Sequence, residues 1–165
     1  MGAARQPEML RAGHRAPEFS LTRLDGGSTT LREILAASPA LFVFFKSTCP
    51  VCQMTLPYLE RIHQGGVPGS LTVYGISQDD AATTREFVEE FGITFPMLLD
   101  TEESGYPASN EYSISHVPSQ FLVEQDGSIG WSYDGFNRRD FQSIARLAGL
   151  NPFRPGEKVP DWKSG

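Results

Sequence analysis

The only two cysteines of the chain, Cys49 and Cys52, stand three positions apart with a Pro-Val dipeptide between them. Two cysteines placed at random in a chain of this length would have this spacing roughly 1% of the time, so the pairing carries information. An unbroken apolar run at 41–45 comes directly before the pair, and a run with helical periodicity at 53–63 follows it. A strand, a Cys-x-x-Cys sequence and a helix in this order are typical of proteins that perform thiol-disulfide exchange.

The expected position of the pair gives its two sulfurs different roles. A thiolate attacks a disulfide, and the partial positive charge of a helix N-terminus favours the thiolate. Cys49 lies at the predicted helix start, with Pro50 in the first turn, where a missing N–H has no cost. Cys52 lies one turn further in and is expected to be more buried. We therefore expect Cys49 to attack and Cys52 to resolve the mixed disulfide, the alternative being two ordinary buried cysteines.

A metal site is the other common use of a Cys-x-x-Cys sequence. A structural zinc ion needs about four ligands, and this pair supplies two. The sequence holds no second cysteine pair and no His-x-x-x-His spacing. We therefore expect no bound metal, and no cofactor beyond a Cys49–Cys52 disulfide.

Apolar patterning predicts the elements that position the pair. Alternation at 16–22 and the turn at 25–27 indicate a β-hairpin that ends at Thr30, which can cap a short helix at 31–36. Further strands are expected at 40–45, 71–76, 120–123 and 129–133, the last two as a hairpin. Further helices are expected from Cys49 to Gly65 with a kink at Pro57, from Asp79 or Asp80 to Phe91, and at 139–147, with a loop and one short helix within 103–112.

The order of these elements defines the fold class. Strands and helices alternate first, and an antiparallel hairpin comes last. This predicts an α/β domain with a central mixed sheet, helices on both faces and an N-terminal β-hairpin extension. The length of 165 residues suits one domain. We expect a flexible lead at 1–15, the domain at 16–150 and a C-terminal surface tail at 151–165, which carries three prolines and five charged residues.

The overall charge bounds the partners and the location. A net charge of −6 and a pI near 5.0 argue against nucleic acid or an acidic membrane surface as the main partner. No stretch approaches the roughly 18 apolar residues of a membrane span, and the N-terminus has no apolar signal core. The sequence as it stands predicts a cytoplasmic protein, or a periplasmic or membrane-tethered one if a signal or anchor has been removed. A monomer is favoured, although nothing in the sequence fixes the oligomeric state.

Several motifs together resemble the thioredoxin superfamily, beginning with the segment around the cysteine pair at 44–52 and the later Val117-Pro118 step within 117–122. The fuller pattern is similar to the TlpA/ResA-like and AhpC/TSA (redoxin) branch, which shares the Ala-Pro-x-Phe-x-Leu segment at 16–21, Gly-Ile-Ser at 75–77, Tyr112, Ile114 and the Asp-Gly turn at 126–127. The resemblance covers about residues 13–150. It implies a thioredoxin-like fold and a thiol-disulfide oxidoreductase that acts on protein thiols or disulfides or on a redox partner protein.

The resemblance also implies a substrate groove. Pro118 is expected to follow a cis peptide bond and to lie beside the cysteine pair. Its peptide group and that of Val117 would bind extended substrate backbone near Cys49. Thr48 and Pro50, on either side of Cys49, are expected to line the same groove, although the superfamily often has a tryptophan where Thr48 stands.

Three further residues could tune the thiols. Lys46, at the end of the strand, could lower a thiol pKa, but its ammonium more simply faces water while its stem covers the surface. His116, two residues before Pro118, could approach the pair. Thr55 stands where the family often has an acid, three residues after the second cysteine, so the sequence identifies no proton acceptor for Cys52.

Two other functions stay open as alternatives. Peroxiredoxins resemble the chain but carry Pro-x-x-x-Thr/Ser-x-x-Cys, and the matching positions before Cys49 hold Phe42 and Lys46. A thiol peroxidase is therefore disfavoured. A thioredoxin-fold binding module without redox turnover is the second alternative, motivated by Thr48 and Thr55.

Overall fold

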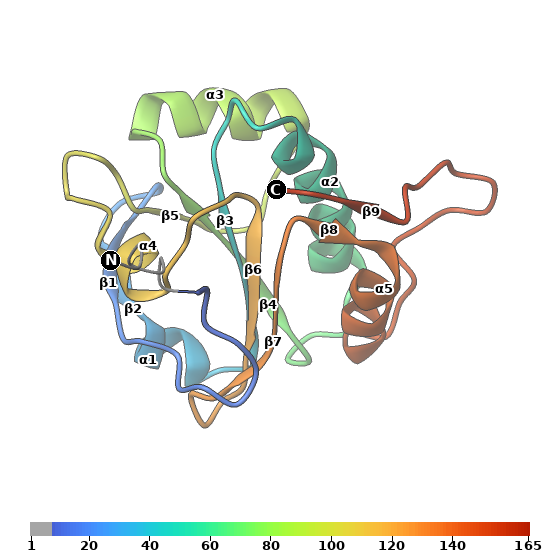
Figure 1. The fold of residues 1–165 in the computed structure, drawn as a ribbon, viewed down its shortest axis with the longest axis horizontal. Helices are drawn as coiled ribbons and strands as arrows, with labels where there is room; N and C mark the ends of the chain where they lie inside the picture. Colours follow the sequence, from blue (N-terminus) through green and yellow to red (C-terminus); the bar gives the residue numbers. More distant parts are fainter. Residues whose placement is uncertain (1–7) are drawn as a thin grey trace, which may run out of the picture.

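A computed structural model describes residues 8–165, and a seven-stranded sheet forms its centre (Figure 1). The strands lie in the order β2-β1-β5-β4-β3-β6-β7. Their bounds are β1 (Ser20–Arg23), β2 (Ser28–Thr30), β3 (Ala40–Phe45), β4 (Thr72–Ser77), β5 (Met97–Leu99), β6 (Ser119–Val123) and β7 (Ile129–Asp134). A separate two-stranded sheet joins β8 (Phe136–Asn137) to β9 (Trp162–Lys163).

The sheet is mixed because of its connections. Strand β3 pairs in parallel with β4, and β4 with β5, while the hairpins β1–β2 and β6–β7 and the pairs β1–β5 and β3–β6 are antiparallel. Parallel neighbours need a crossover, and helices α2 (Pro50–Gly65) and α3 (Ala81–Phe91) provide the two crossovers. The remaining helices are α1 (Leu31–Leu35), α4 (Pro107–Glu111) and α5 (Arg138–Leu147).

Strand β3 is the centre of the core, and all six of its residues are buried. Its odd-numbered side chains, such as Val43 and Phe45, pack with residues of α2, α3 and α5 on one face of the sheet. Its even-numbered side chains, such as Phe42 and Phe44, pack with residues of α1 and α4 on the other face. The predicted mixed sheet with helices on both faces and an added N-terminal hairpin is confirmed.

Local capping signals place the helix starts as the sequence predicts. The Thr30 hydroxyl accepts a hydrogen bond from the Glu33 N–H at the start of α1, and Asp80 accepts one from the Thr83 N–H at the start of α3. Gly92 ends α3 with a φ of 65°, a left-handed conformation in which glycine has no steric cost. Helix α2 runs on through Pro57, which has no N–H to donate within the helix. The kink expected there stays a prediction.

The two ends of the chain make contacts that the sequence did not indicate. The predicted flexible lead falls partly on residues 1–7, which lie outside the described residues. Within the rest of it, Gly13 donates its N–H to the Ile129 carbonyl, and Arg15 forms a β-bridge with Ser128. At the other end, β9 pairs with β8 in an antiparallel register. Two-residue strands that pair across a long stretch of sequence have no periodicity from which they could be predicted.

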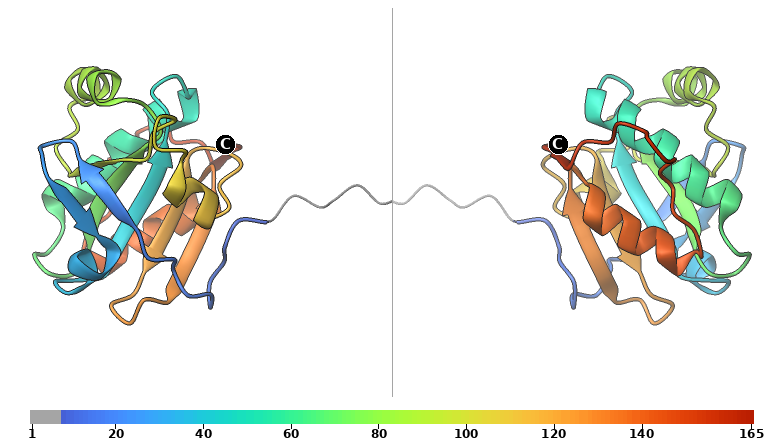
Figure 2. Two further views of the ribbon diagram at one scale, coloured as in Figure 1. Left: turned by 90° about the vertical axis from the view of Figure 1, so that its left-hand side faces the viewer. Right: turned by 90° about the vertical axis from the view of Figure 1, so that its right-hand side faces the viewer.

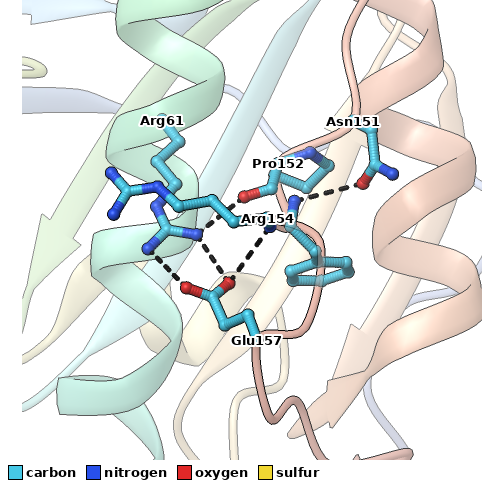
Figure 3. Close-up of polar contacts among 6 residues, drawn as sticks. Arg61, Asn151, Pro152, Arg154 and Glu157 are labelled. Atoms are coloured by element: carbon cyan, nitrogen blue, oxygen red, sulfur yellow. Dashed lines mark hydrogen bonds and ion pairs between the residues drawn. The ribbon is translucent and has the colours of Figure 1, made fainter.

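The segment 151–157 is fixed to α2, as Figure 3 shows. The Arg61 guanidinium donates to both carboxylate oxygens of Glu157, at 2.8 and 2.9 Å, and to the Pro152 carbonyl at 2.8 Å. Phe153 packs against a cluster of three other rings, those of Tyr58, Phe136 and Phe141. The segment is therefore attached in two ways, by the hydrogen bonds of Arg61 and by the packing of Phe153, and residues 158–165 follow this attachment.

This ion pair predicts a dependence on pH. The hydrogen bond with Arg61 lowers the pKa of Glu157 below its ordinary value. A carboxyl with a lowered pKa in the folded state stabilises the fold above its unfolded pKa, and this contribution is lost as the pH falls through the folded pKa. Glu157→Gln should therefore increase hydrogen exchange at 152–157 at neutral pH, and the difference from wild type should disappear well below about pH 4.3. Equal hydrogen exchange in the two proteins at neutral pH would show that the Arg61–Glu157 ion pair does not stabilise this segment.

Among residues 8–165, none of the helices has the length and the apolar character of a membrane span.

Candidate active site

The two cysteines lie at the junction of β3 and α2. Cys49 is the N-cap of α2, with an extended backbone, and Pro50 is the first helical residue. The Cys52 N–H donates to the Cys49 sulfur at 3.1 Å, so this sulfur takes the place that a serine or aspartate oxygen has in an ordinary N-cap. The sequence order of strand, cysteine pair and helix is therefore the order in the fold.

The two thiols have different surroundings. Cys49 is half-buried and its thiol donates to the Val117 carbonyl at 3.4 Å, whereas Cys52 is completely buried. Burial raises the pKa of the Cys52 thiol far above its ordinary value, and the neighbouring Cys49 sulfur adds to this effect. The Lys46 main chain acts in the opposite direction, and the Asp79 charge raises the pKa a little further. Cys49 is thus the accessible sulfur and Cys52 the protected one.

The Val117-Pro118 segment faces the pair from the start of β6. The peptide bond between these two residues is cis, the conformation that the family resemblance implies. Its position is held by two hydrogen bonds: Ser119 donates its hydroxyl to the His116 carbonyl at 2.6 Å, and Gly135 donates its N–H to the Pro118 carbonyl at 2.7 Å. The Val117 carbonyl therefore lies in a fixed position opposite the Cys49 sulfur.

The surface around Cys49 holds the other predicted groove residues. Thr48 and Pro50 are exposed on either side of it. Two surface hollows flank this point. One of about 780 Å³ includes Lys46 and Thr48 in its lining, and one of about 260 Å³ includes Lys46 and Val117. A partner chain that reaches Cys49 would contact this surface.

The three residues proposed to tune the thiols differ in their burial and in their contacts. Lys46 is exposed, and its carbonyl accepts the Cys49 N–H at 3.2 Å. The exposed His116 ring interacts with its neighbours, with Nδ1 3.0 Å from the Ser115 hydroxyl and 3.9 Å from the Asp134 carboxylate. Thr55 is completely buried, and its hydroxyl donates to the Val51 carbonyl of the same helix at 2.7 Å.

Two residues for which the sequence predicted no role at the cysteine pair fix the loop before Cys49. Asp79 accepts the Ser47 N–H at 2.7 Å, and Gln53 donates its side-chain amide to the Ser47 carbonyl at 2.8 Å. Asp79 was expected only as a possible helix cap, a role that Asp80 takes. The available signal was topological, because the carboxyl ends of the parallel strands β3 and β4 meet at the same edge of the sheet.

The Asp79 contact predicts an effect on both stability and turnover. Asp79→Ala leaves the half-buried Ser47 N–H without its acceptor, which should cost about 1–2 kcal/mol of unfolding free energy. The loosened loop should lower catalysed disulfide reduction by about tenfold, because small displacements of a reacting group reduce rates strongly. Asp80→Ala is the matched control, since it removes the cap of α3 but no contact of the loop 46–48. Equal activity in the two variants would show that Asp79 does not position the site.

Gln120, two residues after Pro118, is a buried polar residue. Its side-chain amide donates to the Gly135 carbonyl at 2.9 Å, while its Oε1 has no hydrogen-bond partner among the described residues. Gly135 is therefore hydrogen-bonded through its N–H to Pro118 and through its carbonyl to Gln120 of β6. Within residues 8–165 no group of three or more His, Cys, Asp or Glu side chains could hold a metal ion.

The fold and the site define a class of protein: a thioredoxin-like domain with a Cys-x-x-Cys pair at the start of its first long helix. Residues 12–132 match the model of the AhpC/TSA family, so the chain belongs to that family. Within it, the chain lies in the thioredoxin-like redoxin branch, as the sequence motifs predict.

Named relatives agree with this assignment. The chain is 27% identical to the thiol-disulfide oxidoreductase ResA of Halalkalibacterium halodurans over 122 residues, which are 73% of this chain and 67% of ResA. It is 30% identical to the methylamine utilization protein MauD of Methylobacillus flagellatus over 118 residues, 71% of this chain and 54% of MauD. Among solved structures, a putative protein disulfide isomerase from Bacteroides thetaiotaomicron superimposes with a TM-score of 0.71 at 25% identity, covering 83% of this chain and 87% of that one.

Proposed function

We propose that the protein is a thiol-disulfide oxidoreductase that cycles Cys49 and Cys52 between a dithiol and a disulfide by exchange with protein disulfides. The observation that carries this function is the asymmetry of the pair. A half-buried Cys49 sulfur lies at a helix N-terminus 3.4 Å from the Val117 carbonyl, and a completely buried Cys52 follows one turn later. The similarity to ResA supports the same activity.

In the reducing direction the Cys49 thiolate attacks one sulfur of the partner disulfide. This forms a Cys49–partner disulfide and releases the other partner sulfur as a thiolate, which takes up a proton. Cys52 then loses its proton and attacks the Cys49 sulfur, so that the Cys49–Cys52 disulfide forms and the second partner thiolate leaves. Two electrons pass from the cysteine pair to the partner. The reverse sequence oxidises a partner dithiol, and neither direction uses a metal or an added cofactor.

The direction depends on the reduction potential of the pair relative to the redox poise of its compartment. A cytosolic glutathione pool favours the dithiol and hence a reductant, whereas an oxidising compartment favours the disulfide. The partner is a protein thiol or disulfide, or a dedicated redox protein that returns the pair to its starting state.

Catalysed reduction of insulin by dithiothreitol tests this function. At catalytic concentrations, wild-type protein should shorten the lag time before the insulin B chain precipitates, relative to dithiothreitol alone. Identical precipitation times with and without the protein would overturn the proposal. The same preparation should consume hydrogen peroxide no faster than free cysteine, because Phe42 is buried in β3 and neither it nor Lys46 supplies the hydroxyl of a peroxide site.

The raised pKa of Cys52 predicts how the second step depends on pH. Burial is the largest cause of this shift and persists when Cys49 is bound to a partner. Because only the thiolate attacks, release of the partner should become about tenfold faster for each pH unit between about 6 and 8. Acid quenching and mass analysis of the Cys49–partner disulfide measure this rate. A release rate that does not change over this range would exclude deprotonation of Cys52 as the limiting step.

A further inference from the structure

The segment 161–165 lies against the same carbonyl that faces Cys49. A Cβ atom built on Gly165 would be only 3.0 Å from the Val117 carbonyl oxygen. That oxygen accepts the hydrogen bond of the Cys49 thiol at 3.4 Å. In Figure 1 the C label lies beside the upper ends of β3 and β6, where α2 begins, and in the right-hand view of Figure 2 the red segment crosses the same side of the molecule as α5.

The segment reaches this position as an added strand. In the pairing of β8 with β9, Phe136 lies opposite Lys163 and Asn137 opposite Trp162. At the preceding residue, Gly135, with a φ of 96°, a Cβ would collide with the Lys163 carbonyl and lie 2.9 Å from the Gly165 nitrogen. Since Gly135 is itself hydrogen-bonded to Pro118, the added strand passes directly over the residue that supports the groove.

Few side-chain contacts hold the segment in place. Asp161 forms an ion pair with Arg138 at 2.5 Å and accepts the Arg138 N–H through its carbonyl at 2.9 Å. All residues from 161 to 165 are exposed, and Trp162 retains 64% of its surface. The attachment therefore depends on main-chain pairing and one solvent-exposed ion pair, which is a weak interaction. Another extended chain could replace it without unfolding the domain.

The geometry points to β8 and the Val117 carbonyl as the partner-binding surface, with residues 161–165 in the place of the partner. This inference rests on the proposed disulfide exchange. We propose that the partner is an extended peptide segment that displaces β9 and pairs antiparallel with β8 through its main chain. By analogy with the segment it replaces, the partner strand carries an acidic residue opposite Arg138, an aromatic residue next to it, and its reactive cysteine at the place of Gly165.

The attachment upstream lets the displaced segment return. Glu157 and Phe153 hold residues 151–157 to α2 by contacts that do not involve β8–β9 pairing. Val159 also packs against the core. Residues 160–165 can therefore leave the groove while these attachments stay intact. When the partner leaves, the segment is still close to its site and closes over it again.

A shortened chain that ends at Pro160 tests the inference. Reduced protein is mixed with insulin or with hydroxyethyl disulfide, a small disulfide without a peptide chain, and formation of the Cys49–Cys52 disulfide is followed by acid quenching and alkylation. The shortened chain should react with insulin about 5- to 10-fold faster than the full chain. The reason is that the resident strand no longer lowers the fraction of molecules whose groove is free to bind the partner. Its reaction with the small disulfide should be unchanged. Equal rates with insulin in the two chains, or an equal gain with both disulfides, would overturn the inference.

A full-length variant serves as a control in case the shortened chain misfolds. Asp161→Lys replaces the ion pair with Arg138 by a repulsion and should raise the rate with insulin in the same direction. Glu124→Lys makes the same change of charge at the β6–β7 turn and should leave both rates unchanged. An Asp161→Lys rate equal to that of Glu124→Lys would count against the inference. Failure of every variant, and of wild type, to react with the small disulfide would instead refute the proposed function.

Discussion

Cys49→Ser is expected to reduce catalysed insulin reduction to the rate of dithiothreitol alone. A serine hydroxyl is not ionised at neutral pH and cannot form the mixed disulfide. The protein's own contribution to the rate, above the dithiothreitol background, should therefore fall on the order of 10³-fold or more. The fold should survive, because a serine oxygen is a good acceptor for the Cys52 N–H that now donates to the sulfur.

Two measurements separate this result from trivial outcomes. The thermal unfolding midpoint of Cys49→Ser should lie close to that of wild type, which excludes a loss of activity through unfolding. Alkylation of the reduced wild-type protein should modify Cys49 and leave the buried Cys52 unmodified. Substantial insulin reduction by a folded Cys49→Ser protein would show that another group attacks the disulfide.

Cys52→Ser is expected to stop the cycle after its first step. Cys49 keeps its exposure and its place at the helix start, so it still attacks a partner disulfide. The buried serine cannot attack the Cys49 sulfur, and the mixed disulfide therefore accumulates to nearly one partner per protein chain. Repeated turnover should fall to the background rate while the first turnover is retained.

Mass analysis under non-reducing conditions checks this prediction. The adduct should map to Cys49 and should be absent from a variant in which both cysteines are replaced. In wild type the same adduct should be short-lived, because Cys52 releases it. An adduct that is equally stable in wild type would show that Cys52 does not resolve it.

The elements that position the site follow from local signals in the sequence. A few adjacent residues determine each of them, namely the apolar run of β3 and the Cys49-Pro50 step at the start of α2. Capping by Thr30 and Asp80 fixes two other helix starts in the same way. Such features are predictable because the physical cause and its effect lie within one turn of each other.

Other features of the site depend on contacts between distant parts of the chain. Asp79 reaches Ser47 from the next parallel strand, a contact that depends on the pairing of β3 with β4. The pairing of β9 with β8 rests on main-chain hydrogen bonds between two-residue strands, which leave no pattern of apolar residues. A sequence pattern cannot report such contacts, since the residues become neighbours only after the sheet has formed.

Thr55 shows a different limit of prediction from the sequence. The family resemblance led us to expect a carboxylate at this position, three residues after the second cysteine. The threonine hydroxyl instead donates to the Val51 carbonyl inside α2. Among the described residues, Asp79 is the carboxylate whose charge raises the pKa of Cys52. Its side chain is already an acceptor for Ser47, which suits a positioning role.

The reduction potential of the Cys49–Cys52 pair tests the central claim most directly. Wild-type protein is equilibrated in glutathione buffers of known ratio, quenched with acid and alkylated, and the fraction of disulfide is measured by mass. We predict one reversible two-electron transition in which both cysteines are converted together, with a potential between roughly −120 and −270 mV. A pair that stays reduced in every buffer, or that joins glutathione without closing its own disulfide, would contradict the exchange cycle.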